Sequence, residues 1–169
     1  YHIFDNPFLF TEEIGYDKAR VIADKLSLPT NTVEHTCALT IHLLKKDNGK
    51  ALVYYKESIH IARSIEGYPL PLNRVFFNAA KFYSLEKQHE EAILLCNEAL
   101  NINEKNQSTE LMEYIIYEKA YNSYFLGDTS YLEQYNDALS MARINRNVHV
   151  IETIYGDLKE LIHFSTSTD

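Results

Sequence analysis

The chain has 169 residues, of which 46% are hydrophobic and 24% charged, and its formal net charge at pH 7 is −8. A nucleic-acid surface needs clustered lysine and arginine to displace phosphate counterions, whereas the basic residues here are scattered, with no run longer than Lys45-Lys46. No apolar run approaches the roughly 18 residues of a membrane span, so we expect a globular protein whose partners are neither nucleic acid, through this segment, nor a membrane.

The first ten residues, YHIFDNPFLF, have no basic end, so we do not expect a signal peptide. Because the chain starts at Tyr1 rather than at a methionine, we expect it to be a piece of a longer protein. Cys37 and Cys96 lie on apolar helical faces, as buried thiols do in a reducing compartment. The expected location is cytoplasmic.

A first helical hairpin is expected at about residues 1–28. Its second helix is GYDKARVIADKL, in which Ala19, Ala23 and Leu26 share one face. The partner helix is either YHIFDNPFLF or a segment outside this sequence.

A second hairpin is expected at about residues 31–66. Asn31 and Glu34 have the spacing of a capping box at the start of a helix over residues 32–46, and Asn48-Gly49 forms the turn. The residues expected to face inward are Leu39, Leu43 and Leu44 in the first helix and Ala51, Leu52, Tyr55 and Ile59 in the second.

The strongest helical pattern lies in a third hairpin, at about residues 72–104. Apolar or small residues recur there at spacings of three and four, which places them on one face of each helix. They are Phe76, Ala79, Ala80 and Tyr83 in the first helix and Ala92, Ile93, Cys96, Ala99 and Leu100 in the second. Ala80 and Ala92 are small where two helix backbones would cross closely, because protein cores are packed to crystal-like density.

A fourth hairpin is expected at about residues 109–146, with its turn at Gly127-Asp128. Its inward-facing residues are Ile116, Ala120 and Tyr124, followed by Tyr131, Leu132, Tyr135 and Ala138. A capping helix over residues 148–164 follows, with residues 165–169 as a disordered tail. Its inward-facing residues are Ile151, Ile154, Tyr155, Leu158 and Leu161.

The hairpin at 72–104 resembles the tetratricopeptide repeat (TPR), a unit of two antiparallel helices. Phe76 takes the large aromatic position of that pattern and Ala80 the small one, whereas Glu104 replaces the usual terminal proline and Lys87 a common turn glycine. The resemblance implies an all-α fold, a right-handed solenoid of TPR-like hairpins closed by a terminal capping helix.

Enzymatic motifs are not found. The sequence His89-Glu90-Glu91-Ala92-Ile93 begins like a zinc-protease HExxH, but Ile93 stands where the second histidine is needed. His35 and His42 lie two helical turns apart without a third ligand at metal spacing. We expect no enzymatic activity, no metal site and no cofactor.

The expected site is the groove formed by the first helices of the hairpins, which line the concave side of such a stack. An extended peptide needs hydrogen-bonding partners for its backbone and rigid rings for its apolar side chains. The residues expected to bind it are Arg74, Phe77, Asn78, Lys81, Tyr114, Tyr117, Glu118, Tyr121 and Asn122, with Ser84 and Phe125 on the same side. The TPR resemblance assigns the peptide backbone to Asn78, whereas the tyrosines follow from their position and could instead be packed between hairpins.

The whole chain also resembles the C-terminal repeat domain of peptide-pheromone-responsive helix-turn-helix regulators of Gram-positive bacteria. Equivalent positions recur 41 residues apart from Ala51 to Ala92 and 39 apart from Ala92 to Tyr131, which exceeds the TPR norm of about 34. The turn YFLGD and the helix ALSMAR add to the likeness. It implies a preceding DNA-binding domain, a short peptide in the groove and a homodimer.

Two functions stay open. The first is peptide sensing and dimerisation within a transcriptional regulator, and the second is a constitutive TPR adaptor or scaffold that holds a protein partner. A carboxylate-binding adaptor needs several cations in its groove, where only Arg74 and Lys81 qualify, set against Glu118.

Overall fold

The computed structural model describes residues 48–64, 66–70 and 72–167, and throughout these ranges the regular structure is helical. The helices are α3 (Asn48–Ser64), α4 (Leu72–Leu85), α5 (His89–Lys105), α6 (Met112–Phe125), α7 (Tyr131–Ile144) and α8 (Val148–Ser167). The hairpin expected at 1–28, the helix at 32–46 with its capping box, and Cys37, His35 and His42 lie outside the described residues. The all-α prediction is confirmed for the part that is described.

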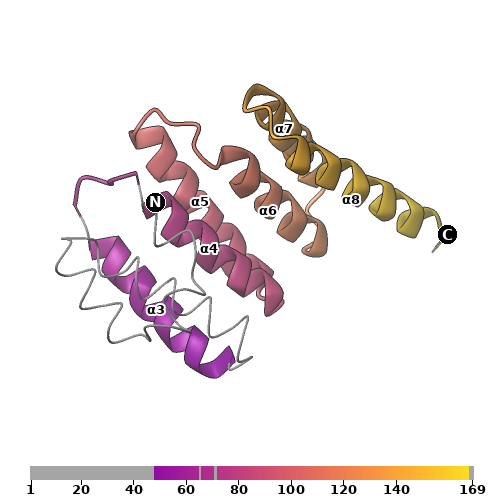
Figure 1. The fold of residues 1–169 in the computed structure, drawn as a ribbon. Coiled ribbons are helices and arrows are strands. Elements are labelled where there is room, and N and C mark those ends of the chain that lie inside the picture. The colour runs from indigo at the N-terminus through magenta and orange to yellow at the C-terminus, as the bar shows by residue number, and fades with distance from the viewer. Residues whose placement is uncertain (1–47, 65, 71, 168–169) are drawn as a thin grey trace, which may run out of the picture.

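Successive helices lie side by side and form a row from α3 to α8 (Figure 1). Helix α4 packs along α5 and α6 along α7, each pair joined by a short turn as in an antiparallel hairpin. Helix α4 also contacts α6, and α6 contacts α8. These three helices therefore line one side of the stack, which is the arrangement expected for its concave face.

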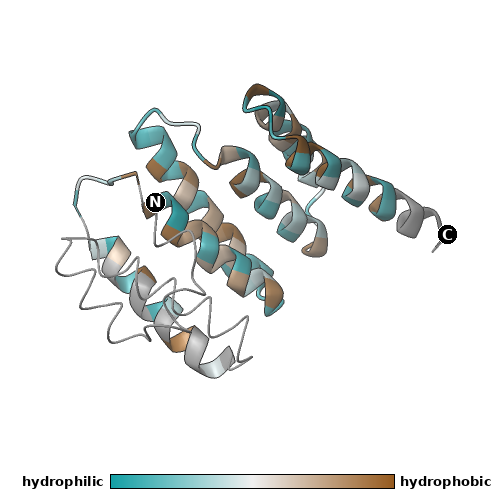
Figure 2. Cartoon of the chain, viewed as in Figure 1, coloured by the Kyte–Doolittle hydropathy of each residue, from teal (hydrophilic) through white to brown (hydrophobic). Residues whose placement is uncertain are grey.

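The larger core cluster joins α3, α4, α5 and the start of α6. Ala80 and Ala92, predicted to sit where the helices cross, are both 0% exposed. The other predicted core residues of this hairpin are also buried, except that Ile93 and Leu100 are half-buried. The buried ones are Phe76, Ala79, Tyr83, Cys96 and Ala99. Hydrophobic and hydrophilic residues alternate along the same helices in Figure 2, as one-sided burial requires.

A smaller cluster joins α6, α7 and α8 around Ala120, Tyr135, Ala138 and Ile154. Tyr114 packs against both clusters and is the side chain they share.

Two residues predicted to face inward are exposed: Leu132 is 47% and Tyr155 is 51% exposed. Each follows directly after a residue of the inner stripe, and a helix turns by about 100° per residue, which rotates the next side chain outward. The hydroxyl of Tyr155 instead accepts a hydrogen bond of 2.7 Å from Arg143. Helix α8 continues to Ser167, beyond the end at 164 that the apolar pattern suggested.

Four helices end in the same way, with a residue in the left-handed region two positions after the helix. At the end of α6 this residue is Gly127, with φ of 75°. Asp128 N–H donates to the carbonyl of Ser123 and Gly127 N–H to that of Tyr124, which together form a Schellman cap. The corresponding residues after α4, α5 and α7 are not glycine: they are Lys87, Gln107 and Arg146.

Buried amides fix the links between hairpins. Asn73, at the start of α4, donates a hydrogen bond of 2.7 Å to Asn103 near the end of α5. Asn103 in turn donates to the carbonyl of Glu110, at 2.7 Å, in the segment leading to α6. Both asparagines are 1% exposed, so these bonds hold the hairpin and the next link in one geometry.

Throughout the described part of the chain, every helix is either too short or too polar to span a lipid bilayer.

Candidate functional site

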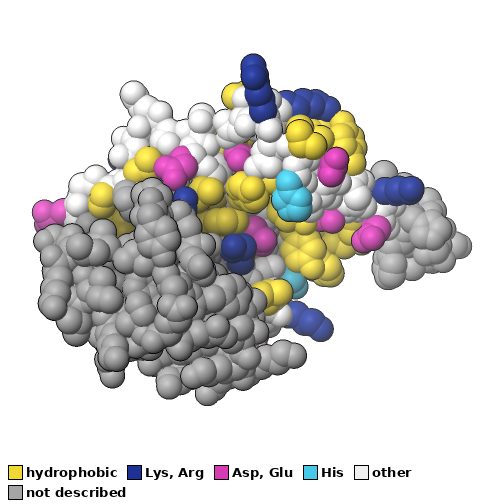
Figure 3. Space-filling model, viewed as in Figure 1, with side chains coloured by type: hydrophobic (Ala, Val, Ile, Leu, Met, Phe, Trp, Pro, Cys, Tyr) yellow, Lys and Arg dark blue, Asp and Glu magenta, His cyan; other side chains and the backbone are white. Residues whose placement is uncertain are grey.

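A cavity of about 640 Å³ opens between the end of α4, the turn after it and the face of α6 that lines the groove. It is lined by Lys81, Ser84, Leu85, Lys87, His89, Tyr117, Glu118, Tyr121 and Phe125. Figure 3 shows hydrophobic side chains across this side of the molecule, interrupted by acidic and basic ones. The cavity therefore offers apolar surface together with charged groups.

Four of the predicted site residues line this cavity: Lys81, Tyr117, Glu118 and Tyr121. Sequence reasoning missed Leu85, Lys87 and His89 as lining residues, because it considered Lys87 only as a turn residue and His89 only as part of an incomplete zinc motif. The short turn between α4 and α5 could have indicated these residues, because a short turn keeps its residues next to the ends of the helices that it joins.

The other predicted residues of α4 lie further along the same helix. Phe77 is only 6% exposed; its ring lies 4.8 Å beneath the ammonium group of Lys81 and 6.2 Å from the ring of Tyr114. Arg74 forms an ion pair of 3.5 Å with Glu110, so part of its charge is already balanced.

Asn78 is half-buried between Arg74 and Lys81, one helical turn from each. Its side-chain amide forms no hydrogen bond with any other part of the described chain. This amide can therefore donate and accept at the groove surface.

Asn122 differs from the expectation, since its side chain is 0% exposed. Its Nδ2 donates to the carbonyl of Glu118 at 2.7 Å, which turns Oδ1 toward Nδ1 of His89, also at 2.7 Å. That oxygen accepts, so a neutral His89 carries its proton on Nδ1. The His89 ring also stacks on Phe125, with centroids 5.0 Å apart. Asn122 thus positions a wall of the cavity from below.

Glu118 is the acidic residue that lines the cavity, and the pKa of its carboxyl group is shifted. Burial raises its pKa to about 7, and the negative charge of Asp157 acts in the same direction, whereas Lys81 and the amide of Asn122 oppose the shift. Burial also lowers the pKa of Lys81, although Glu118 counteracts this. Desolvation therefore outweighs the attraction between the two groups.

Tyr117 joins α6 to α8, because its hydroxyl donates to the carboxylate of Asp157. Its ring also packs edge-on against Tyr135, at 5.9 Å. Burial and this hydrogen bond raise the pKa of Tyr117 far above its usual range. Tyr117 therefore packs between hairpins and lines the cavity at the same time.

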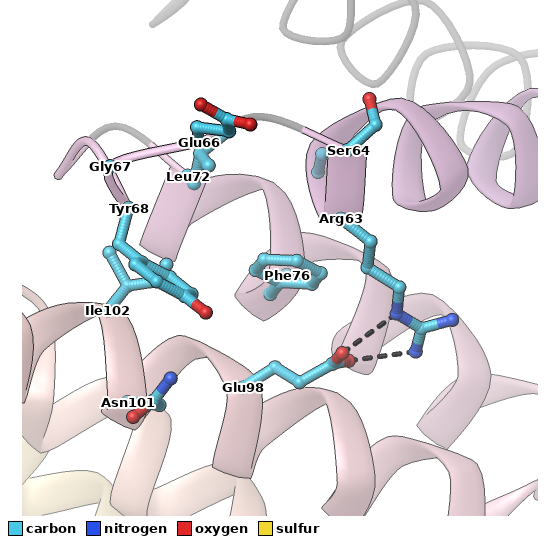
Figure 4. A pocket seen from close by; sticks show the side chains of 11 residues that line it. Arg63, Ser64, Glu66, Gly67, Tyr68, Leu72, Phe76, Glu98, Asn101 and Ile102 are labelled. Atoms are coloured by element: carbon cyan, nitrogen blue, oxygen red, sulfur yellow. Dashed lines mark hydrogen bonds and ion pairs between the residues drawn. The ribbon is translucent and has the colours of Figure 1, made fainter.

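A second cavity, of about 460 Å³, lies between α3, the segment after it and α5. Figure 4 shows Arg63 and Glu98 joined across it, with N–O distances of 2.7 and 2.9 Å. In this second cavity Arg63 and Glu98 already bind each other, and none of the predicted site residues lines it. The cavity beside α6 is therefore the better candidate. Among the described residues, no group of histidine, cysteine, aspartate and glutamate could hold a metal ion.

Two solved structures have a similar fold. The N-terminal domain of stress-induced protein-1 (STI-1) from C. elegans matches 75% of this chain and 92% of its own, with a TM-score of 0.56 and 17% identity. Bacillus thuringiensis PlcR, solved in complex with the peptide PapR7 and DNA, matches 91% of this chain and 62% of its own, with a TM-score of 0.68 and 16% identity. No protein-family profile and no curated relative matches the sequence. The fold is thus TPR-like and resembles that of PlcR.

Proposed function

We propose that this chain is the peptide-sensing and dimerising repeat domain of a cytoplasmic transcriptional regulator, whose DNA contacts are made outside these 169 residues. The observation that supports it most is the groove along α4 and α6, which combines an open cavity, the exposed ring of Phe125 and the unpaired amide of Asn78. The similarity to PlcR, which was solved with a peptide and DNA, is consistent with this role.

Sensing requires that the peptide binds one arrangement of the stack more tightly than another. Helix α6 is suited to this, because it contacts α4 on one side and α8 on the other. A peptide lying along α4 and α6 would touch the joint between the two core clusters at Tyr114.

The first test replaces the amide that would hold the peptide backbone. Asn78→Ala should weaken the binding of a peptide selected from a library by about 1–3 kcal/mol, because a desolvated backbone group would lose its partner. Isothermal titration calorimetry measures this loss.

The matched control is Asn97→Ala, which removes an exposed amide from α5. Unchanged affinity in the Asn78 variant would remove this residue from the site. If no short peptide binds while a folded protein partner does, the sensing function is wrong.

The alternative is a constitutive adaptor, and the fold similarity to the STI-1 domain is consistent with it. Recognition of an acidic partner would need free cations in the groove, but Arg74 is paired with Glu110 and Glu118 adds a negative group. Sedimentation equilibrium with and without bound peptide separates the two, since the adaptor requires no change of assembly on binding.

A further inference from the structure

We propose that the cavity beside α6 selects a positively charged group of the bound peptide, and that Glu118, Tyr121 and Phe125 recognise it. The group is a lysine or arginine side chain, or the amino-terminal ammonium. This inference rests on the proposed peptide binding and specifies the chemistry that the site prefers.

The first support is the state of the acid. Glu118 lines the cavity yet forms no ion pair with another described residue. A carboxylate removed from water without a cation in direct contact is destabilised. A ligand cation would supply that partner.

The second support is the ring arrangement beside the acid. The rings of Tyr121 and Phe125 lie 4.9 Å apart at 57°, and His89 stacks on Phe125 at an angle of 7°. Phe125 is 52% exposed. Ring faces attract cations, and they also pack against the apolar stem of a lysine or arginine.

The cations already present do not occupy this place. The Lys81 ammonium lies over the ring of Phe77, 4.8 Å from the ring centroid, and Lys87 is exposed in the turn. The pKa of Glu118 stays raised although Lys81 opposes the shift, so Lys81 does not satisfy it. The titratable and charged groups that face Glu118 are Lys81 from α4, His89 and Cys96 from α5, Tyr117 and Tyr121 from α6, Tyr135 from α7 and Asp157 from α8.

The test uses mixtures of heptapeptides that are acetylated and amidated at their ends, with one position fixed as lysine, arginine, norleucine or glutamate. At pH 8 we expect lysine or arginine at one position to bind about tenfold more tightly than norleucine, measured by competition in fluorescence anisotropy. Norleucine mixtures with a free amino terminus test the other source: a gain there, without a gain from lysine, assigns the cation to the peptide terminus.

The variant Glu118→Gln should abolish the preference, while Glu133→Gln, an exposed acid on α7, should keep it. Circular dichroism verifies that both are folded. In the wild type, the preference should fall by up to about tenfold from pH 8 to pH 6, because Glu118 then binds a proton in place of the ligand cation. A pH effect that survives in Glu118→Gln would come from a group other than this carboxyl group.

Three results overturn the inference while peptide binding itself stands: a preference for glutamate, a wild type that prefers neither a basic residue nor a free amino terminus, or a preference that persists in Glu118→Gln. Absence of binding by every mixture overturns the proposed function as well. If Glu118→Gln does not fold, the wild-type titration decides, and a lysine preference that is the same at pH 6 and pH 8 counts against the inference.

Discussion

At the scale of single residues, Glu118 is an acid that is buried at a cost to the stability of the fold. Its carboxyl group lies among aromatic rings at the cavity, where burial raises its pKa to about 7. The unfolded chain releases the same proton near the ordinary value of 4.5. Between these two values the folded protein binds a proton that the unfolded chain does not, so the contribution of Glu118 to stability falls as the pH rises.

We therefore predict that Glu118→Gln is more stable than the wild type at pH 8, by up to about 3 kcal/mol. The difference should shrink through pH 7 and disappear below about pH 4.5, where both side chains are neutral. Urea denaturation at pH 4.5 and pH 8 measures it, with Glu133→Gln as the control. A variant that is less stable than the wild type at pH 8 would show that the carboxylate has a partner in the folded protein.

Residues also differ in how far their roles could be read from the sequence. Ala80 and Ala92 were correctly predicted to be buried, because only small side chains fit where two helices cross closely. Asn122 was expected at the groove surface but is buried, and its amide is held by His89, 33 positions away in the chain. Such a pairing depends on how two hairpins stack, and helical periodicity in the sequence does not predict the stacking.

At the scale of elements, the turns are defined by their backbone conformation. Glycine is the residue best suited to the left-handed region, where other residues are strained by about 1–2 kcal/mol. The sequence predicted a turn at Gly127, but it did not predict that Lys87 also adopts the left-handed conformation, with φ of 61°. The TPR pattern has a glycine at that turn, so the substitution was visible although its backbone consequence was not.

Gly127→Ala should lower the free energy of unfolding by about 1 kcal/mol. An added Cβ would meet no atom within 4 Å, so the whole effect comes from the backbone conformation. The reciprocal change, Lys87→Gly, should leave stability unchanged or raise it slightly. Thermal denaturation of both variants checks this, and a loss at Lys87→Gly similar to that at Gly127→Ala would contradict it.

At the scale of the whole molecule, the hydrophobic core is divided into two clusters, one around α4 and α5 and the other around α7 and α8. In a stack of this kind each unit is stabilised by its neighbours and not by one central core. The sequence predicted the order of helices, because each keeps its own apolar stripe. It did not predict the division, because that depends on which helices meet in space.

Ile154→Ala should test the division. Ile154 is 0% exposed in the smaller cluster, so the truncation should cost about 2–4 kcal/mol. Hydrogen exchange measured by mass spectrometry should become much faster in α7 and α8 than in α4 and α5. Ile144→Ala, at a side chain that is 69% exposed, is the control. Equal acceleration in all helices would show a single cooperative unit.

The sharing of Tyr114 by both clusters has a mechanical consequence. The part of the chain beyond this ring includes the 20 residues of α8, so a tilt of the smaller cluster about Tyr114 would move the far end of α8 the most. A helix of that length spans about 30 Å, so a tilt of only about 5° would carry its far end by roughly 2–3 Å. A displacement of that size is comparable to the helix shifts by which known protein switches alter their interfaces. A bound peptide that moved the ring of Tyr114 would produce it.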